Sequence, residues 1–192
     1  MSDGFSGAIT ALEGAEFEGA VHVSDAGLRG MISLRGDLSD EKLAKAVKSA
    51  VGLSLPGKRE IKEGVKGAVA WMSPDELLLL VDHDKADAIV ERLDKALKNI
   101  HYLAVNVSDA RAMILVKGQG CREVIAKGAP ADVSADGLPI GEIRRTRLGQ
   151  LAVAFWLSDD KTMNVICFRS VGVHVYKWLC NAGAKGTLPE FL

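Results

Sequence analysis

The order of hydrophobic and polar positions predicts a strand followed by a helix near the start of the chain. Residues 31–35 alternate between apolar and polar side chains, as a half-buried strand does. Residues 41–51 instead repeat apolar side chains with a helical period, directly after Ser39 and Asp40, either of which can cap a helix. The residues expected to face the core from this helix are Leu43, Ala46, Val47 and Ala50.

A hairpin and a second helix are predicted next. Residues 52–66 are rich in Gly, Pro and Lys and break the pattern. Residues 68–72 and 77–81 are apolar runs that flank the turn at 73–75, an arrangement typical of a β-hairpin. Residues 84–98 then form an amphipathic pattern, which predicts a helix.

The same order of elements recurs from Tyr102 onward. Residues 34–37 (LRGD) match 116–119 (VKGQ) at an offset of 82 positions, and residues 71–75 (WMSPD) match 156–160 (WLSDD) at an offset of 85. The second unit comprises a helix at 121–127, strands at 151–157 and 162–168, and a helix at 171–181. We therefore predict an α+β fold of two pseudo-repeated β-α-β-β-α units, with antiparallel sheets and helices packed on one side.

These patterns also predict how the chain is divided. Residues 1–27 are rich in Gly, Ala and Glu without a sustained period, and we expect a flexible arm that becomes ordered on a partner surface. Residues 28–192 are expected to form a single compact domain. Its two halves would span 28–100 and 101–182, followed by a short C-terminal tail.

Composition narrows the class of protein. The 192 residues are 48% apolar and 26% charged, which is typical of a folded globular chain. The 24 Lys and Arg nearly balance the 25 Asp and Glu, so neither nucleic acid nor an anionic membrane is expected as a partner. The longest apolar runs fall far short of the ~20 residues that a membrane helix needs. The first residues lack the features of a secretion signal, so we expect a cytoplasmic protein.

Enzymatic motifs are weak. The three cysteines, Cys121, Cys167 and Cys180, are widely spaced and favour buried thiols over a disulfide or zinc site. His83 lies between two aspartates, where a solvated turn is a simpler interpretation than a metal ligand. The glycines at 118 and 120 stand between a strand and a helix, but Glu123 occupies the position of the third glycine of a dinucleotide loop. We interpret them as a tight turn.

Surface chemistry is concentrated in one arginine cluster. Arg144, Arg145 and Arg147 lie on a segment expected to include an exposed strand edge or loop, where they either bind a partner's carboxylates or discourage edge pairing by charge. Trp178, beside Lys177, is the tryptophan best placed to reach a surface. These four residues, Arg144, Arg145, Arg147 and Trp178, are the candidate partner interface. No catalytic, cofactor-binding or metal-binding residue is assigned.

Several motifs, taken in order, support a family resemblance. Residues 106–128 resemble the entry segment of the aminomethyltransferase superfamily, with Asn106 and Cys121 as departures from its pattern. The W-x-x-P-D-E run at 71–76 and the order of motifs from Ala129-Pro130 to Trp178-Leu179 resemble the sarcosine oxidase gamma subunit family. This resemblance covers roughly residues 28–182.

The resemblance implies a non-catalytic gamma-type subunit of a heterotetrameric sarcosine oxidase, on a fold similar to the folate-binding domain of aminomethyltransferases. Alpha, beta and delta subunits would be the partners, and FAD, FMN, NAD and tetrahydrofolate would be bound by those partners rather than by this chain. Residues 148–156 contain no carboxylate where the aminomethyltransferases carry their catalytic aspartate, so that chemistry is not expected here. The alternatives are a stand-alone folate-binding protein, a folate-dependent transferase, or an adaptor on the same degenerate fold.

Overall fold

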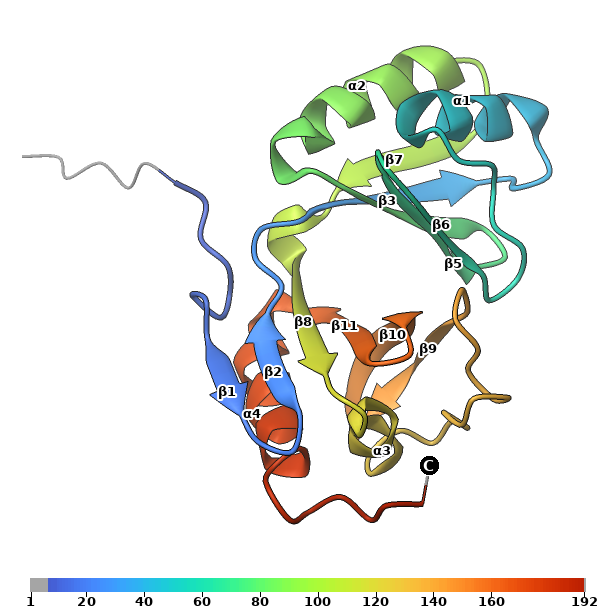
Figure 1. Cartoon of the computed structure of the whole chain (residues 1–192). Coiled ribbons are helices and arrows are strands. Elements are labelled where there is room, and N and C mark those ends of the chain that lie inside the picture. The colour runs from blue at the N-terminus through green and yellow to red at the C-terminus, as the bar shows by residue number, and fades with distance from the viewer. Residues whose placement is uncertain (1–6, 192) are drawn as a thin grey trace, which may run out of the picture.

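The computed structural model describes residues 7–191, which form two antiparallel sheets stacked between layers of helices (Figure 1). The first sheet has the strand order β4-β5-β6-β3-β7, and the second has the order β1-β2-β8-β11-β10-β9. The strands of the first sheet are β3 (Gly30–Gly36), β4 (Ile61–Gly64), β5 (Gly67–Ser73), β6 (Glu76–Val81) and β7 (Tyr102–Asn106). Those of the second are β1 (Glu16–Glu18), β2 (His22–Asp25), β8 (Arg111–Lys117), β9 (Ile143–Leu148), β10 (Leu151–Asp159) and β11 (Thr162–Phe168).

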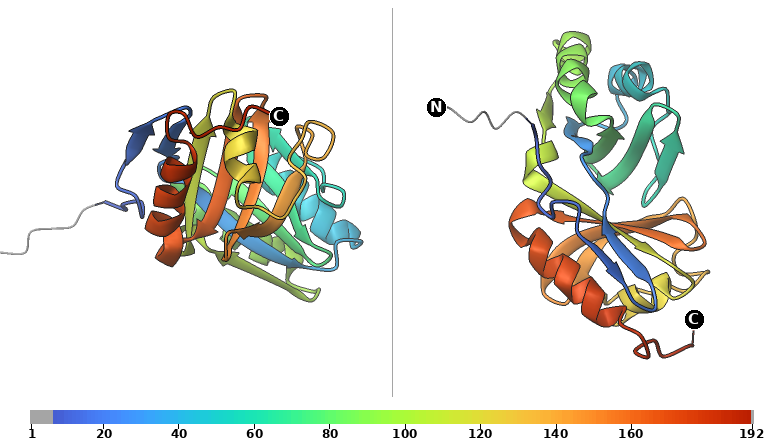
Figure 2. Two further views of the ribbon diagram at one scale, coloured as in Figure 1. Left: turned by 90° about the horizontal axis from the view of Figure 1, so that it is seen from below. Right: turned by 60° about the vertical axis from the view of Figure 1, so that its left-hand side comes forward.

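Each sheet carries its own pair of helices on its outer face (Figure 2). Helices α1 (Glu41–Val51) and α2 (Ala86–Leu97) cover the first sheet, and α3 (Cys121–Ala126) and α4 (Gly172–Ala182) cover the second. A third apolar cluster, including Met31, Leu78 and Trp156, lies between the inner faces of the two sheets. The predicted α+β fold with antiparallel sheets is confirmed. Between residues 7 and 191, no helix is long and apolar enough to cross a membrane.

Helix α1 forms as its sequence predicts. The Asp40 carboxylate accepts a hydrogen bond of 2.7 Å from the Lys42 backbone N–H, which satisfies a free donor at the helix start. Gly52 ends the helix with a positive φ of 77°, a conformation that glycine adopts without steric cost. The four side chains predicted to face the core, Leu43, Ala46, Val47 and Ala50, are buried.

The pairing of the strands shows the internal repeat. Strands β5 and β10 are each second from the edge of their sheets, and both contain a register shift beside the hairpin turn. Leu34 lies opposite Leu77 and Val116 opposite Met163, which agrees with the offset of 82. In the hairpins, however, Leu157 rather than Trp156 takes the place of Trp71, because Trp71 pairs with Leu77 and Leu157 with Met163.

The two tryptophans therefore differ in their surroundings. Trp156 is 1% exposed and lies in the cluster between the sheets, whereas strand alternation places Trp71 on the outer, helix-covered face. The sequence match at an offset of 85 located equivalent strands but aligned them one residue out of register.

The prediction of a flexible arm at 1–27 is wrong for residues 16–25. Strand β2 pairs with β8, and β1 pairs with β2, so these residues extend the second sheet. Val21 and Val23 are 3% and 0% exposed, and their burial holds the segment within this chain without a partner. Residues 1–6 lie outside the described part.

The boundary predicted between the halves, at residues 100 and 101, is also displaced. Strand β7 at 102–106 pairs with β3 in the first sheet, and β2 precedes β3 in the chain but belongs to the second sheet. The chain thus crosses between the sheets twice, through the links 26–29 and 107–110. In the tail, the backbone N–H groups of Glu190 and Phe191 donate to the buried Glu123 carboxylate.

Candidate functional site: an arginine-rich inner face

Strand β9 divides the predicted arginine cluster between its two sides. Ile143 packs between the sheets, so alternation along the strand places Arg145 and Arg147 on the same inner face. Arg144 lies on the opposite face, where it donates to the Glu142 carboxylate at 2.5 Å and to the Gly137 carbonyl. The Arg144 side chain is only 14% exposed. The structure therefore brings Arg145 and Arg147 together and removes Arg144 from their side.

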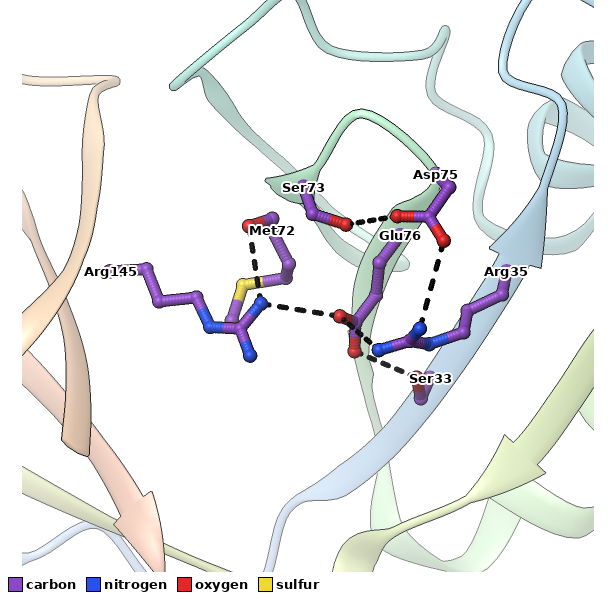
Figure 3. Close-up of polar contacts among 7 residues, drawn as sticks. All are labelled: Ser33, Arg35, Met72, Ser73, Asp75, Glu76 and Arg145. Atoms are coloured by element: carbon purple, nitrogen blue, oxygen red, sulfur yellow. Dashed lines mark hydrogen bonds and ion pairs between the residues drawn. The ribbon is translucent and has the colours of Figure 1, made fainter.

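Glu76 is the polar centre of the inner face (Figure 3). It begins β6, is 6% exposed, and accepts hydrogen bonds from Arg35 at 2.9 Å and from Ser33 at 3.1 Å. Arg145 reaches across from the second sheet and donates to the same carboxylate at 3.3 Å. A buried carboxylate is stable only when it is paired and hydrogen-bonded, so Glu76 ties the two sheets together.

Asp75, beside Glu76 in the hairpin turn, belongs to the same charged group. Its carboxylate accepts from the Ser73 hydroxyl at 2.5 Å and lies 3.7 Å from Arg35. The pKa of Asp75 is lowered, chiefly by the Ser73 hydrogen bond and further by the positive charges of Arg35 and Arg145. Both carboxylates of the turn thus form ion pairs with Arg35.

Arg111 extends this group along the second sheet. It begins β8 and stacks on the Phe168 ring, with its guanidinium carbon 4.3 Å from the ring centre. Its Nε is buried and has no hydrogen-bond partner between residues 7 and 191. Burial lowers the pKa of Arg111. The Glu76 carboxylate partly offsets this shift, and the positive charge of Arg145 adds to it.

Trp178 lies away from these arginines. It projects from α4 in the outer helix layer, packs over Gly128, and lines a cavity of about 260 Å³ with His174 and Leu148. Any side chain at position 128 would meet the Trp178 ring at about 2.4 Å, so the glycine allows this packing. The four candidate interface residues therefore do not form one patch.

A second cleft opens between the sheets at the β4–β5 hairpin. It has a volume of about 330 Å³, and Glu63, Asn164 and Ser158 lie along its wall. The Glu63 carboxylate accepts from Trp156 Nε1 at 2.9 Å and from Ser158 at 3.4 Å, and Asn164 donates to Ser158 at 2.6 Å. These polar groups satisfy one another across the sheets.

The glycine turn and the acidic residue noted in the sequence after residue 117 have structural roles. Gly118 has a φ of 136° at the turn between β8 and α3, as a tight turn requires. Glu123 lies buried after this turn, and its carboxylate binds the backbone of the C-terminal tail. Within residues 7–191, no three His, Cys, Asp or Glu side chains are grouped as metal ligands.

Sequence reasoning missed Glu76, Arg111 and Phe168. In the sequence, Arg111 stands directly before the apolar run 112–116. An arginine at that position indicates where a strand begins and does not by itself indicate a site. Phe168 lies opposite Arg111 in the sheet although 57 positions separate them. Only the pairing of β8 with β11 brings the two side chains together.

Comparisons with known proteins agree with this fold. A family model described as "Sarcosine oxidase, gamma subunit family" matches residues 35–185. Sarcosine oxidase subunit gamma from Corynebacterium sp. (strain U-96) is 27% identical over 184 residues, which cover 94% of this chain and 88% of that protein.

Two solved structures share the fold. One is the heterotetrameric sarcosine oxidase from Corynebacterium sp. U-96 in complex with pyrrole 2-carboxylate, with a TM-score of 0.77 and 23% identity, over 87% of this chain and 86% of that chain. The other is glycine cleavage system aminomethyltransferase T from Bartonella henselae, with a TM-score of 0.59 and 13% identity, over 81% of this chain and 44% of that chain. The predicted similarity to the aminomethyltransferase fold is confirmed.

Proposed function

Because this chain belongs to the sarcosine oxidase gamma subunit family, we propose that it is the gamma-type subunit of a heterotetrameric sarcosine oxidase, an oxidoreductase complex, and that it supports assembly rather than chemistry. Its partners in this proposal are alpha, beta and delta subunits. They would carry the FAD, FMN, NAD and tetrahydrofolate of the complex. We place the complex in the cytoplasm, where Cys121, Cys167 and Cys180 would stay reduced.

The family match over residues 35–185 is the observation that carries this proposal. The inner face adds support for a non-catalytic role. Its buried carboxylate, Glu76, accepts hydrogen bonds from two arginines and a serine, and these contacts stabilise the group as a structural ion pair rather than as a base exposed to a substrate. The segment 148–156 carries no carboxylate either. An arginine-rich face with its acids already paired is suited to binding, not to acid–base catalysis.

Co-expression with the other subunits tests the proposal. We expect the chain to co-elute with them in size exclusion at a fixed ratio, and we expect the purified chain alone to be colourless and not to oxidise sarcosine. Failure to co-elute would refute the proposed function. A tight, saturable titration of the isolated chain with tetrahydrofolate would instead support the folate-binding alternative.

The predicted interface residues are tested in the same complex. Reversal of Arg144, Arg145 and Arg147 to Glu is expected to weaken assembly through Arg145 and Arg147. Arg144→Glu alone would disturb the contacts with Glu142 and Gly137 and is expected to lower stability more than assembly. Trp178→Ala provides a separate test of the outer helix layer, and an intact complex would remove Trp178 from the interface.

A further inference from the structure

The inner faces of the two sheets are not fully covered by one another. Strand β7 is the edge of the first sheet, and its Leu103 and Val105 are 51% and 40% exposed. Both lie on the inner face, because they pair with Arg35 and Ser33 of β3. On the second sheet, Phe168 is 46% exposed at the end of β11. Three large apolar side chains are thus left open to solvent on faces that elsewhere pack together.

The same region has an excess of positive charge. Arg35, Arg111, Arg145 and Arg147 all project from the inner faces, and Glu76 and Asp75 are their acidic partners there. Arg35 contacts both acids and Arg145 contacts Glu76, which accounts for the two negative charges. Arg111 and Arg147 form no ion pair within residues 7–191. Two guanidinium groups therefore remain without a carboxylate.

Arg111 is also prepared for a carboxylate. Its stacking on Phe168 fixes the plane of the guanidinium, and its Nε is buried without an acceptor. Because Nε is itself covered, an incoming carboxylate would bind the terminal nitrogens of this guanidinium, which have no partner between residues 7 and 191. Arginine binds carboxylates through two parallel hydrogen bonds, which gives such a site directional preference.

We propose that Arg111, Arg147, Phe168, Leu103 and Val105 form a docking face for an acidic segment of a partner subunit, in which Asp or Glu carboxylates bind the two arginines and an apolar side chain packs on Phe168. We choose an acidic occupant because its negative charge would complement the positive charges of the two unpaired arginines. The inference rests on the proposed function, since it requires an assembled complex. Of the four candidate interface residues, this face keeps Arg147 and omits Arg144, Arg145 and Trp178.

The test measures the affinity of the purified chain for the subcomplex of the remaining sarcosine oxidase subunits. Arg147→Glu and Phe168→Ala are each expected to weaken binding by about tenfold or more, as loss of an interface anchor does. Arg92→Glu is the matched control, because Arg92 is exposed on α2 in the outer layer and, between residues 7 and 191, its side chain forms no ion pair and hydrogen-bonds only to the Ala88 carbonyl. Its affinity should equal that of the wild type.

Arg111 needs a milder variant because its side chain is half-buried. Arg111→Lys keeps the charge but loses the planar pair of donors, and we expect weaker binding with unchanged thermal stability. Raising salt should weaken wild-type binding more than that of Arg147→Glu, because the variant has already lost an attractive charge.

The outcomes separate the two proposals. If the wild-type chain does not bind the subcomplex, the proposed function fails. If the wild type binds but Arg147→Glu, Phe168→Ala and Arg111→Lys bind equally well, the complex stands and the docking face is wrong. If all three variants weaken binding while Arg92→Glu does not, the docking face is supported.

Discussion

Replacement of Glu76 by Gln tests whether the buried carboxylate holds the two sheets together. Glu76 is 6% exposed and accepts from Ser33 and Arg35 of the first sheet and from Arg145 of the second. Gln has the same size, so packing is retained. It removes the negative charge and turns one amide group, a donor, toward guanidinium groups that only donate.

The magnitude follows from how far the partners are exposed. Breaking a fully buried ion pair costs about 3–5 kcal/mol, because a charge is left without compensation. Here the side chains of Arg35 and Arg145 are 47% and 52% exposed, so water restores part of their solvation. We therefore expect a loss of about 2 kcal/mol in the free energy of unfolding. For a chain of 192 residues this lowers Tm by about 4–8 °C.

Urea and thermal unfolding followed by circular dichroism measure this loss. Glu41→Gln is the control, since Glu41 pairs with Lys45 on the surface of α1 with its side chain 85% exposed. That variant should lose less than about 0.5 kcal/mol. Equal stability of Glu76→Gln and Glu41→Gln would refute the role we assign to Glu76.

Three further predictions concern stability. Asp40→Ala removes the N-cap of α1 and should lower the free energy of unfolding in urea by about 1 kcal/mol. Asp40→Ser keeps an oxygen that can cap the helix and should retain most of that stability. Gly67→Ala should destabilise the protein by more than about 2 kcal/mol, because Gly67 has a φ of 141° and an added Cβ would lie 2.2 Å from the Leu80 carbonyl oxygen. Thermal unfolding measures this loss, and Gly7→Ala, with open space around Gly7, is the control. Burial raises the pKa of Cys167 from 9.0 to about 11, so the thiol loses its proton at lower pH in the unfolded state than in the folded state. The free energy of unfolding should therefore fall as pH rises from 9 to 11. A Cys167→Ala variant with the same pH dependence of unfolding would contradict this.

The sequence predicted those elements whose pattern is complete within a short window. Helix α1 is one case, because its cap at Asp40, its apolar period and its terminal Gly52 are all local. Strand β4 was missed because its four residues lie in a Gly-rich and Lys-rich stretch too short to show alternation. Strands β1 and β2 were missed because they are stable only against β8, which lies some 90 positions later in the chain.

The candidate site was predicted in part for the same reason. Alternation along β9 separates Arg144 from Arg145 and Arg147, and this signal was present in the sequence once the strand was placed. The sequence carried no signal for the partners of those arginines. Glu76 is 69 positions from Arg145, and only the stacking of one sheet on the other brings them within hydrogen-bonding distance.

The two sides of the inter-sheet space are closed differently, and this places the docking face. At one side, Ile61 N–H donates to the Gly141 carbonyl and Ile143 N–H to the Arg59 carbonyl, each at 2.8 Å, so β4 and β9 are joined by backbone hydrogen bonds. Strand β7, at the opposite edge of the first sheet, has no such bridge to the second sheet within residues 7–191. The inner face beside β7 is therefore the side where the sheets leave Leu103 and Val105 uncovered, and a partner segment can bury them there without breaking the backbone pairing that joins the sheets.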